Sequence, residues 1–189
     1  MGFVDPSFYK DQFDVEGKIV LLTFGLLSRN KGIEHVIAAL PAITARFPDV
    51  IYLVLGATHP HVRQGEGESY RESLQELAAT LGVADHVRFV DRFVALDELV
   101  RYIGAADIYV TPYMNLEQIT SGTLAYTLGA GKAIVSTPYW YARELLSNGR
   151  GVLVPFGSAD AIAREVMSLL EDDTRCQAMR SAPIWRVAR

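Results

Sequence analysis

Apolar positions along the chain follow two patterns, continuous runs and stripes that recur every three or four residues. Continuous runs bounded by turn residues are typical of strands buried on both faces of a sheet, and they occupy 19–25, 50–56, 86–93, 108–113, 133–138 and 151–157. Helical stripes lie between and after these runs, at 32–47, 69–82, 97–105, 121–128, 141–148 and 158–171. Each crossover helix must cover a face of the sheet, so this alternation predicts an α/β fold with a doubly wound, six-stranded parallel sheet.

The same patterns predict one Rossmann-like domain over residues 18–172. Residues 1–17 are polar and aromatic without a clear period, and Pro6 disfavours a helix, so we expect a linker or tail there. After Asp172 the periodicity fades, and residues 173–189 are expected to form a truncated C-terminal segment.

Composition narrows the possible functions. Half of the residues are hydrophobic and 21% are charged, which is ordinary for a globular protein. A net charge of −4 without a Lys/Arg run argues against nucleic-acid binding. The single cysteine, Cys176, excludes a disulfide within the chain and fits a reducing, cytoplasmic setting. No apolar run has the length of a membrane span, and His59 and His61 lack further ligands at metal-binding spacing.

The loop GLLSRNKG at 25–32 is the first candidate for chemistry. Ligands of doubly wound sheets bind at the carboxyl ends of the strands, and this loop follows the first strand. Gly25 and Gly32 bracket Arg29 and Lys31, and two cations beside a helix start suit a diphosphate. The dinucleotide fingerprint G-x-G-x-x-G is absent, and a solvated surface loop is the alternative interpretation.

The stretch PYMNLEQITSGTLAYTLGAGKAIVSTP at 112–138 is the second candidate. Its polar loop carries Glu117, and Thr120, Ser121 and Gly122 open a helix that runs to Leu128. Bare N–H groups at such a helix start favour anions, especially phosphate. The alternative is an ordinary βαβ unit with a capped helix. A P-loop is rejected because the glycine spacing is wrong and the strand follows the Gly-Lys pair.

The stretch STPYWYARELL at 136–146 is the third candidate. Tyr139, Trp140 and Tyr141 gather at the carboxyl end of the fifth strand. Packing or an interface with another domain explains such aromatics, and a sugar-facing role is the functional alternative.

Together these loops resemble the C-terminal domain of family 4 (group 1) retaining glycosyltransferases, which have the GT-B fold. The resemblance covers about residues 17–172, and its order and spacing are more specific than any one motif. It is carried by FGLLSRNKGIEHVIAAL, by LVLG, by VRFVDRFVALDELVRYIGAADIYVTPY, by GAGKAIVSTP and by RELLSNGRGVLVPFG.

The resemblance implies a metal-independent domain, without a cofactor, that binds a nucleoside-diphosphate sugar. Lys31 would contact the diphosphate, and Glu117 would be the first acid of the family's Glu-x7-Glu pattern; both are assigned catalytic roles. The implied donor-binding residues are Gly25, Arg29, Lys31, Glu117, Thr120, Ser121, Gly122, Thr123 and Leu124.

Two departures from the family pattern concern the site. Leu26 stands where the family has an arginine, and Arg29 is the candidate replacement for its charge. The second acid of the Glu-x7-Glu pattern is also missing, since Ala125 or Tyr126 occupies its place. In the family that acid contacts the ribose, so ribose recognition is in question here.

The resemblance further implies that the chain is the donor-binding half of a larger enzyme, without its N-terminal, acceptor-binding domain. Aromatics at 139–141 would then lack their facing domain, so self-association of the fragment is expected. Two alternatives remain open: a domain of the UDP-GlcNAc 2-epimerase type, and a degenerate domain that kept the fold and lost donor binding.

Overall fold

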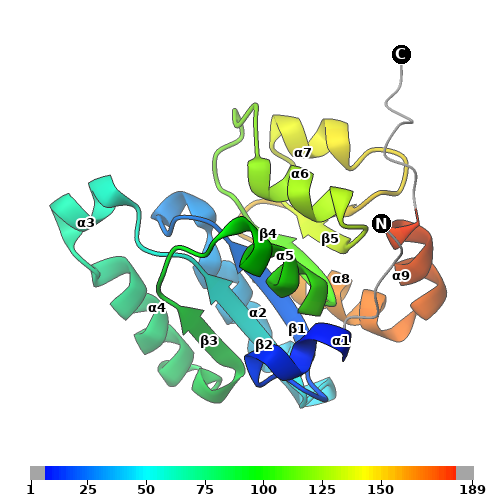
Figure 1. Cartoon of the computed structure of the whole chain (residues 1–189), viewed down its shortest axis with the longest axis horizontal. Coiled ribbons are helices and arrows are strands. Elements are labelled where there is room, and N and C mark those ends of the chain that lie inside the picture. The colour runs from blue at the N-terminus through cyan, green and yellow to red at the C-terminus, as the bar shows by residue number, and fades with distance from the viewer. Residues whose placement is uncertain (1–6, 182–189) are drawn as a thin grey trace.

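The computed structural model describes residues 7–181 and contains one parallel sheet flanked by helices on both faces (Figure 1). Its six strands lie in the order β3-β2-β1-β4-β5-β6. The strands are β1 (Ile19–Phe24), β2 (Val50–Leu55), β3 (Val87–Val90), β4 (Ile108–Thr111), β5 (Ala133–Ser136) and β6 (Val152–Leu153). Every pairing is parallel, which confirms the predicted α/β, doubly wound fold.

The continuous apolar runs arise because both faces of the sheet are covered. Alternate residues of β1 belong to two different core clusters, with Leu21 in one and Val20 and Leu22 in the other. The first cluster lies under α2 (Ile33–Arg46), α4 (Ser69–Thr80), α8 (Ala159–Glu171) and α9 (Asp173–Arg180). The second lies under α5 (Leu96–Ala105), α6 (Gly122–Gly129) and α7 (Trp140–Leu145).

The segment that precedes β1 differs from the linker or tail predicted for residues 1–17. It forms α1 (Ser7–Lys10) and a 3-10 turn at Asp11–Phe13, which pack beside α5. Phe13 stacks on Tyr102 of α5 with ring centroids 3.8 Å apart. Lys10 donates to the carboxylate of Asp107 at 2.7 Å, and Val15 is fully buried. Residues 7–17 therefore belong to the packed domain, while residues 1–6 lie outside the described part of the chain.

Several other local predictions need correction. The polar loop before α4 contains an extra helix, α3 (Pro60–Glu66), where Pro60 occupies the first turn. The α5 helix begins at Leu96 without a side-chain cap, so Asp97 is not its cap but lies in its first turn, paired with Arg101. At the C-terminal end, α9 buries Cys176 and Met179 against the sheet, whereas residues 182–189 lie outside the described residues.

Within residues 7–181, no helix combines the length and the apolar character needed to cross a lipid bilayer.

Candidate functional site

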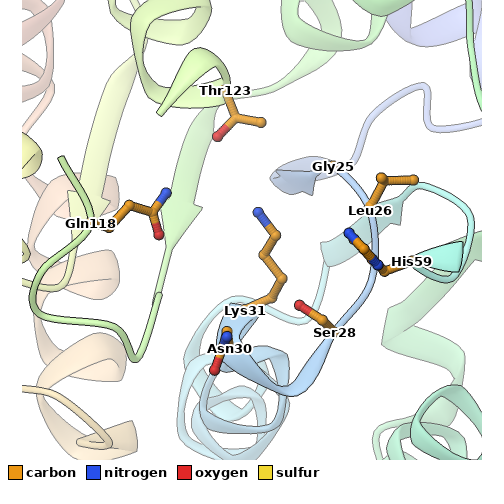
Figure 2. A pocket seen from close by; sticks show the side chains of 8 residues that line it. All are labelled: Gly25, Leu26, Ser28, Asn30, Lys31, His59, Gln118 and Thr123. Carbon is orange, nitrogen blue, oxygen red and sulfur yellow. The ribbon is translucent and has the colours of Figure 1, made fainter. Parts of the chain in front are cut away.

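The order of the strands reverses at β1. The chain builds β1, β2 and β3 toward one edge of the sheet and then crosses back, so that β4 lies on the other side of β1. Loops that leave β1 and β4 diverge at such a point and create a crevice at the carboxyl ends of the strands. A cavity of about 380 Å³ lies there (Figure 2). Its lining comes from these loops and from the loop after β2: Gly25, Leu26, Ser28, Asn30, Lys31, His59, Gln118 and Thr123.

Gly32 brings the two main loops of this cavity together. It has a φ of +62°, and a methyl group at its Cα would lie 2.2 Å from the carbonyl oxygen of Pro112. The backbone N–H of Met114 then donates to the carbonyl of Asn30 at 2.9 Å. A residue without a side chain is therefore required where the start of α2 meets the end of β4.

Lys31 supplies the positive charge of the cavity. It ends a 3-10 turn at Arg29–Lys31, and its ammonium Nζ lies 3.9 Å from the centroid of the Tyr113 ring. Figure 2 shows the ammonium directed toward Gly25 and Thr123. Among the described residues no carboxylate pairs with Lys31. The ring holds the ammonium in place without neutralising it.

The first turn of α6 faces the same cavity. Ser121 is its N-cap, and the Ser121 hydroxyl accepts the N–H of Leu124 at 3.2 Å. The hydroxyl of Thr123 lies 2.9 Å from that of Tyr113 and 3.0 Å from that of Ser121. The N–H groups of Gly122 and Thr123 are outside the helical hydrogen-bond ladder, so they give this end of the helix a partial positive charge.

A second, apolar cavity of about 480 Å³ adjoins the first and shares Gly25, Leu26 and Thr123 with it. Exposed apolar side chains lie along it, Phe93 at 84% and Tyr126 at 53% exposure. Its remaining lining residues are Phe24, Leu55, Gly56, Ala57, Arg92, Val94, Leu96, Leu99 and Gly122.

Arg92 is the charged side chain in the lining of the apolar cavity, and Glu98 engages it through both guanidinium Nη atoms. The hydrogen bond from Arg92 holds the pKa of the Glu98 carboxyl below its usual value. One half of the crevice is thus polar and cationic, and the other half is apolar.

The structure brings some of the predicted site residues together. Gly25, Lys31 and Thr123 line the first cavity, and Gly122 lines the second. Ser121 and Leu124 are buried behind the lining, where they form the cap of α6. Their assignment as donor-binding residues stays a prediction.

Arg29, Glu117 and Thr120 are not among the lining residues of either cavity. Arg29 pairs with Glu66 of α3 at 3.2 Å, and its guanidinium carbon lies 5.3 Å from the centroid of the Tyr70 ring. That placement does not support Arg29 as a replacement for the charge absent at Leu26. Glu117 and Thr120 are exposed on the loop after β4.

Gln118 lines the cavity next to Glu117 and was not foreseen. Its side-chain amide donates to the carbonyl of Thr120 at 3.0 Å, which turns the side chain inward. His59 was also missed, because it was considered only as half of a metal pair. Pro60 is the signal that could have identified His59, because proline is common in the first turn of a helix. A helix that begins at Pro60 places His59 in the short loop that follows β2, on the side of the sheet where the strands end.

The predicted aromatic patch is smaller than expected. Tyr139 is fully buried and stacks on Tyr113, with ring centroids 5.5 Å apart. Tyr141 is half-buried and packs against the core, while Trp140 is 50% exposed. Self-association through this patch therefore depends mainly on Trp140 and stays a prediction.

Comparisons with known proteins concern the chain as a whole. The family model described as "Glycosyl transferases group 1" matches residues 6–183. A phosphatidyl-myo-inositol mannosyltransferase of Mycolicibacterium smegmatis is 31% identical over 166 residues, covering 86% of this chain and 39% of the relative. A GDP-mannose-dependent alpha-(1-6)-phosphatidylinositol monomannoside mannosyltransferase of the same organism is 29% identical, covering 90% of this chain and 43% of the relative.

Solved structures show the same fold. Anabaena HepE in complex with UDP-glucose superimposes with a TM-score of 0.82 at 22% identity, covering 94% of this chain and 46% of that one. The crystallised C-terminal domain of the group 1 glycosyl transferase LpcC from Francisella tularensis gives 0.78 at 18% identity, covering 93% and 87%. The chain thus spans about two fifths of the length of the curated relatives it matches.

Proposed function

The chain belongs to the group 1 glycosyl transferases, and from that premise we propose that it binds the nucleotide-sugar donor of a retaining, metal-independent glycosyltransferase. The observation that carries the proposal is the position of Lys31. Its ammonium has no carboxylate partner among the described residues and faces the first turn of α6 across the crevice. Two sources of positive potential thus converge on one open space, which suits a diphosphate.

The adjoining apolar cavity suits the nucleoside. A nucleoside diphosphate has a charged end and a flat apolar base, and the crevice has a cationic half that continues into an apolar half. Phe93 and Tyr126 offer aromatic rings beside this half, on which a base can stack. The names of three relatives mention GDP-mannose, and HepE was solved with UDP-glucose, so guanine and uracil are the bases to test first.

The chemistry expected of these residues is stabilisation of the leaving group. In the transfer, the bond between the anomeric carbon and the diphosphate oxygen breaks, and its electron pair stays on the diphosphate. The acceptor hydroxyl forms the new bond to the anomeric carbon and gives up its proton, which the released diphosphate can take up. Negative charge grows on the diphosphate, where Lys31 and the N-terminus of α6 would meet it as preorganised positive charge. In this proposal no divalent metal is needed to neutralise the leaving group.

The acceptor side is assigned to residues beyond these 189. A GT-B site is completed by a second domain, and the relatives are more than twice as long as their matched segments. We also propose that Glu117 contacts the donor sugar. Its exposed loop borders the cationic cavity, where the diphosphate and the attached sugar would lie.

Calorimetric titration of the chain with GDP and UDP, each in the presence of EDTA, tests the proposal. We expect saturable binding of at least one of them, unchanged by the chelator. Binding that disappears in EDTA and returns with Mg²⁺ would contradict the metal-independent part of the proposal. Absence of binding under all these conditions would favour a degenerate domain that kept the fold alone.

A further inference from the structure

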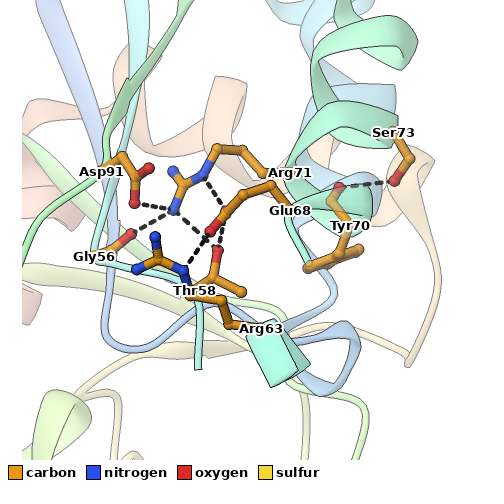
Figure 3. Close-up of polar contacts among 8 residues, drawn as sticks. All are labelled: Gly56, Thr58, Arg63, Glu68, Tyr70, Arg71, Ser73 and Asp91. Atoms are coloured by element: carbon orange, nitrogen blue, oxygen red, sulfur yellow. Dashed lines mark hydrogen bonds and ion pairs between the residues drawn. The ribbon is translucent and has the colours of Figure 1, made fainter. Parts of the chain in front are cut away.

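Arg71 of α4 is a buried cation that neither cavity includes among its lining residues. Its side chain is 6% exposed and lies behind the loops that follow β2 and β3 (Figure 3). A guanidinium in such a place must be paired, because an isolated buried charge is strongly unfavourable. Two carboxylates, Glu68 and Asp91, flank it at 3.3 and 2.6 Å.

The contacts of Arg71 connect the loops after β2 and β3 just beyond the last paired residues of these strands, Leu55 and Val90. Its Nη2 atom donates to the carbonyl of Gly56 at 3.1 Å and to the Thr58 hydroxyl at 3.3 Å, both in the loop after β2. The same atom donates to Asp91 Oδ1 at 2.6 Å in the loop after β3. Thr58 in turn donates to Glu68, which also accepts from Arg71 Nε. One side chain therefore ties both loops to α4.

The two loops that Arg71 ties together form the wall of the apolar cavity. Gly56 and Ala57 line it from the loop after β2, and Arg92, Phe93 and Val94 line it from the loop after β3. Arg71 thus bonds to the backbone of one lining residue, Gly56, and to two side chains next to the lining, those of Thr58 and Asp91. The cationic cavity is held differently, by Gly32, by the hydrogen bond from Met114 to Asn30 and by the cap of α6.

We propose that Arg71 is a positioning residue for the nucleoside half of the donor site, which it shapes by fixing the loops after β2 and β3 without touching the ligand. This inference rests on the proposed function and deepens it. Arginine suits the role because two of its nitrogens act at a fixed separation, Nη2 toward the two loops and Nε toward Glu68, while Nη1 has no partner among the described residues. The ammonium of lysine is a single point of contact and does not span these two positions. Loss of this residue should therefore affect recognition of the nucleoside and leave recognition of the diphosphate unchanged.

The test compares ligands that differ in the nucleoside. Arg71→Lys and Asp91→Ala are titrated with GDP, UDP and inorganic pyrophosphate, beside Lys31→Ala and the control Arg101→Lys, which alters an exposed ion pair on α5. We expect Arg71→Lys and Asp91→Ala to bind the preferred nucleoside diphosphate about tenfold more weakly, by analogy with the lower end of the losses found when a residue that orients a metal ligand is changed. Pyrophosphate binding should fall in Lys31→Ala alone.

Asp91→Ala keeps the test decisive if Arg71→Lys does not fold, since the Asp91 side chain is 51% exposed and its removal spares the core. Equal losses for pyrophosphate and nucleoside diphosphates, or wild-type affinity in both variants, would overturn the proposal. Hydrogen exchange at the amides of 56–58 and 91–94 reports directly on the two loops. It therefore tests the positioning role of Arg71 even if the proposed function is wrong. If the wild-type chain bound no nucleoside diphosphate, faster exchange there in both variants would still support the positioning role, and unchanged exchange would refute it.

Discussion

At the scale of single residues, the proposed site depends on one ammonium group. Lys31 lies above the Tyr113 ring and faces the start of α6, while the neighbouring cation, Arg29, is engaged by Glu66. The sequence placed both cations in the right loop. The sequence did not show that Arg29 turns toward α3. That contact exists because the fold brings Glu66, at the end of α3, next to the loop after β1.

We expect Lys31→Ala to weaken binding of the preferred nucleoside diphosphate by roughly 1.5–3 kcal/mol, since it removes a charge-assisted hydrogen bond. Thermal unfolding should be almost unchanged, because the ammonium pairs with no carboxylate among the described residues. Calorimetry measures the affinity, and Lys18→Ala, which alters an exposed pair with Asp49, is the matched control. Equal affinities in the two variants would remove Lys31 from the site.

Glu68 leads to a prediction about pH. The hydrogen bond from Thr58 lowers the pKa of the Glu68 carboxyl below its ordinary value of 4.5, and Arg71 adds to this effect. A depressed folded-state pKa contributes stability above the unfolded-state pKa, and this contribution is lost as the pH falls through the folded-state value. Thr58→Val should therefore destabilise the protein most near neutral pH, with the difference from wild type narrowing below about pH 4.5. Urea unfolding across this range measures it, and a constant difference would contradict it.

At the scale of elements, the apolar pattern predicted all six strands and the major helices because each is set by local period and burial. The pattern failed where tertiary contacts decide the structure. Residues 7–17 are ordered by the Phe13–Tyr102 stack and by the Lys10–Asp107 ion pair, partners that lie about 90 residues apart. The α3 helix was read as loop because its sequence is polar and contains Gly65.

The junction between α2 and β4 gives the element-scale prediction. Gly32 and Gly82 both have positive φ, 62° and 70°, but a methyl group meets the Pro112 carbonyl at Gly32 and open space at Gly82. Gly82→Ala should lower the free energy of unfolding by about 1–2 kcal/mol through backbone strain alone. Gly32→Ala adds a clash with the main chain and should be at least about 1 kcal/mol worse. Denaturant unfolding measures the free energy of unfolding of both variants. Equal losses of stability would show that the main chain at Pro112 moves easily to make room for the methyl group.

At the scale of the whole molecule, the doubly wound fold followed from the order of strands and helices, whereas the position at which the strand order reverses came from the structure. The division of the crevice into a cationic and an apolar half did not, because it depends on which loop side chains turn inward. Gln118 turns into the cationic cavity, whereas Phe93 and Tyr126 approach the apolar cavity from distant parts of the sequence. Residue type and spacing do not encode such directions.

The 189-residue chain should bind donor and transfer no sugar above background. Holding an acceptor hydroxyl beside the anomeric carbon contributes up to about 7–11 kcal/mol to lowering the barrier, and the proposal assigns that task to a second domain. A crevice open to water also weakens each charge contact. An assay with radiolabelled GDP-mannose and UDP-glucose, on this chain beside the full-length protein, measures the difference. Robust transfer by this chain alone would show that the site is complete within it.

We propose that a nucleoside diphosphate binds in the crevice between the loops after β1 and β4. The most direct test of this proposal is a titration of the ¹⁵N-labelled chain with GDP and UDP in EDTA, followed by amide chemical shifts. We predict saturable shifts at residues 25–32 and 121–124, which extend to 91–94 beside the apolar cavity and are greatly reduced in Lys31→Ala. Saturable shifts confined to another surface, or no saturable shifts at all, would contradict the account.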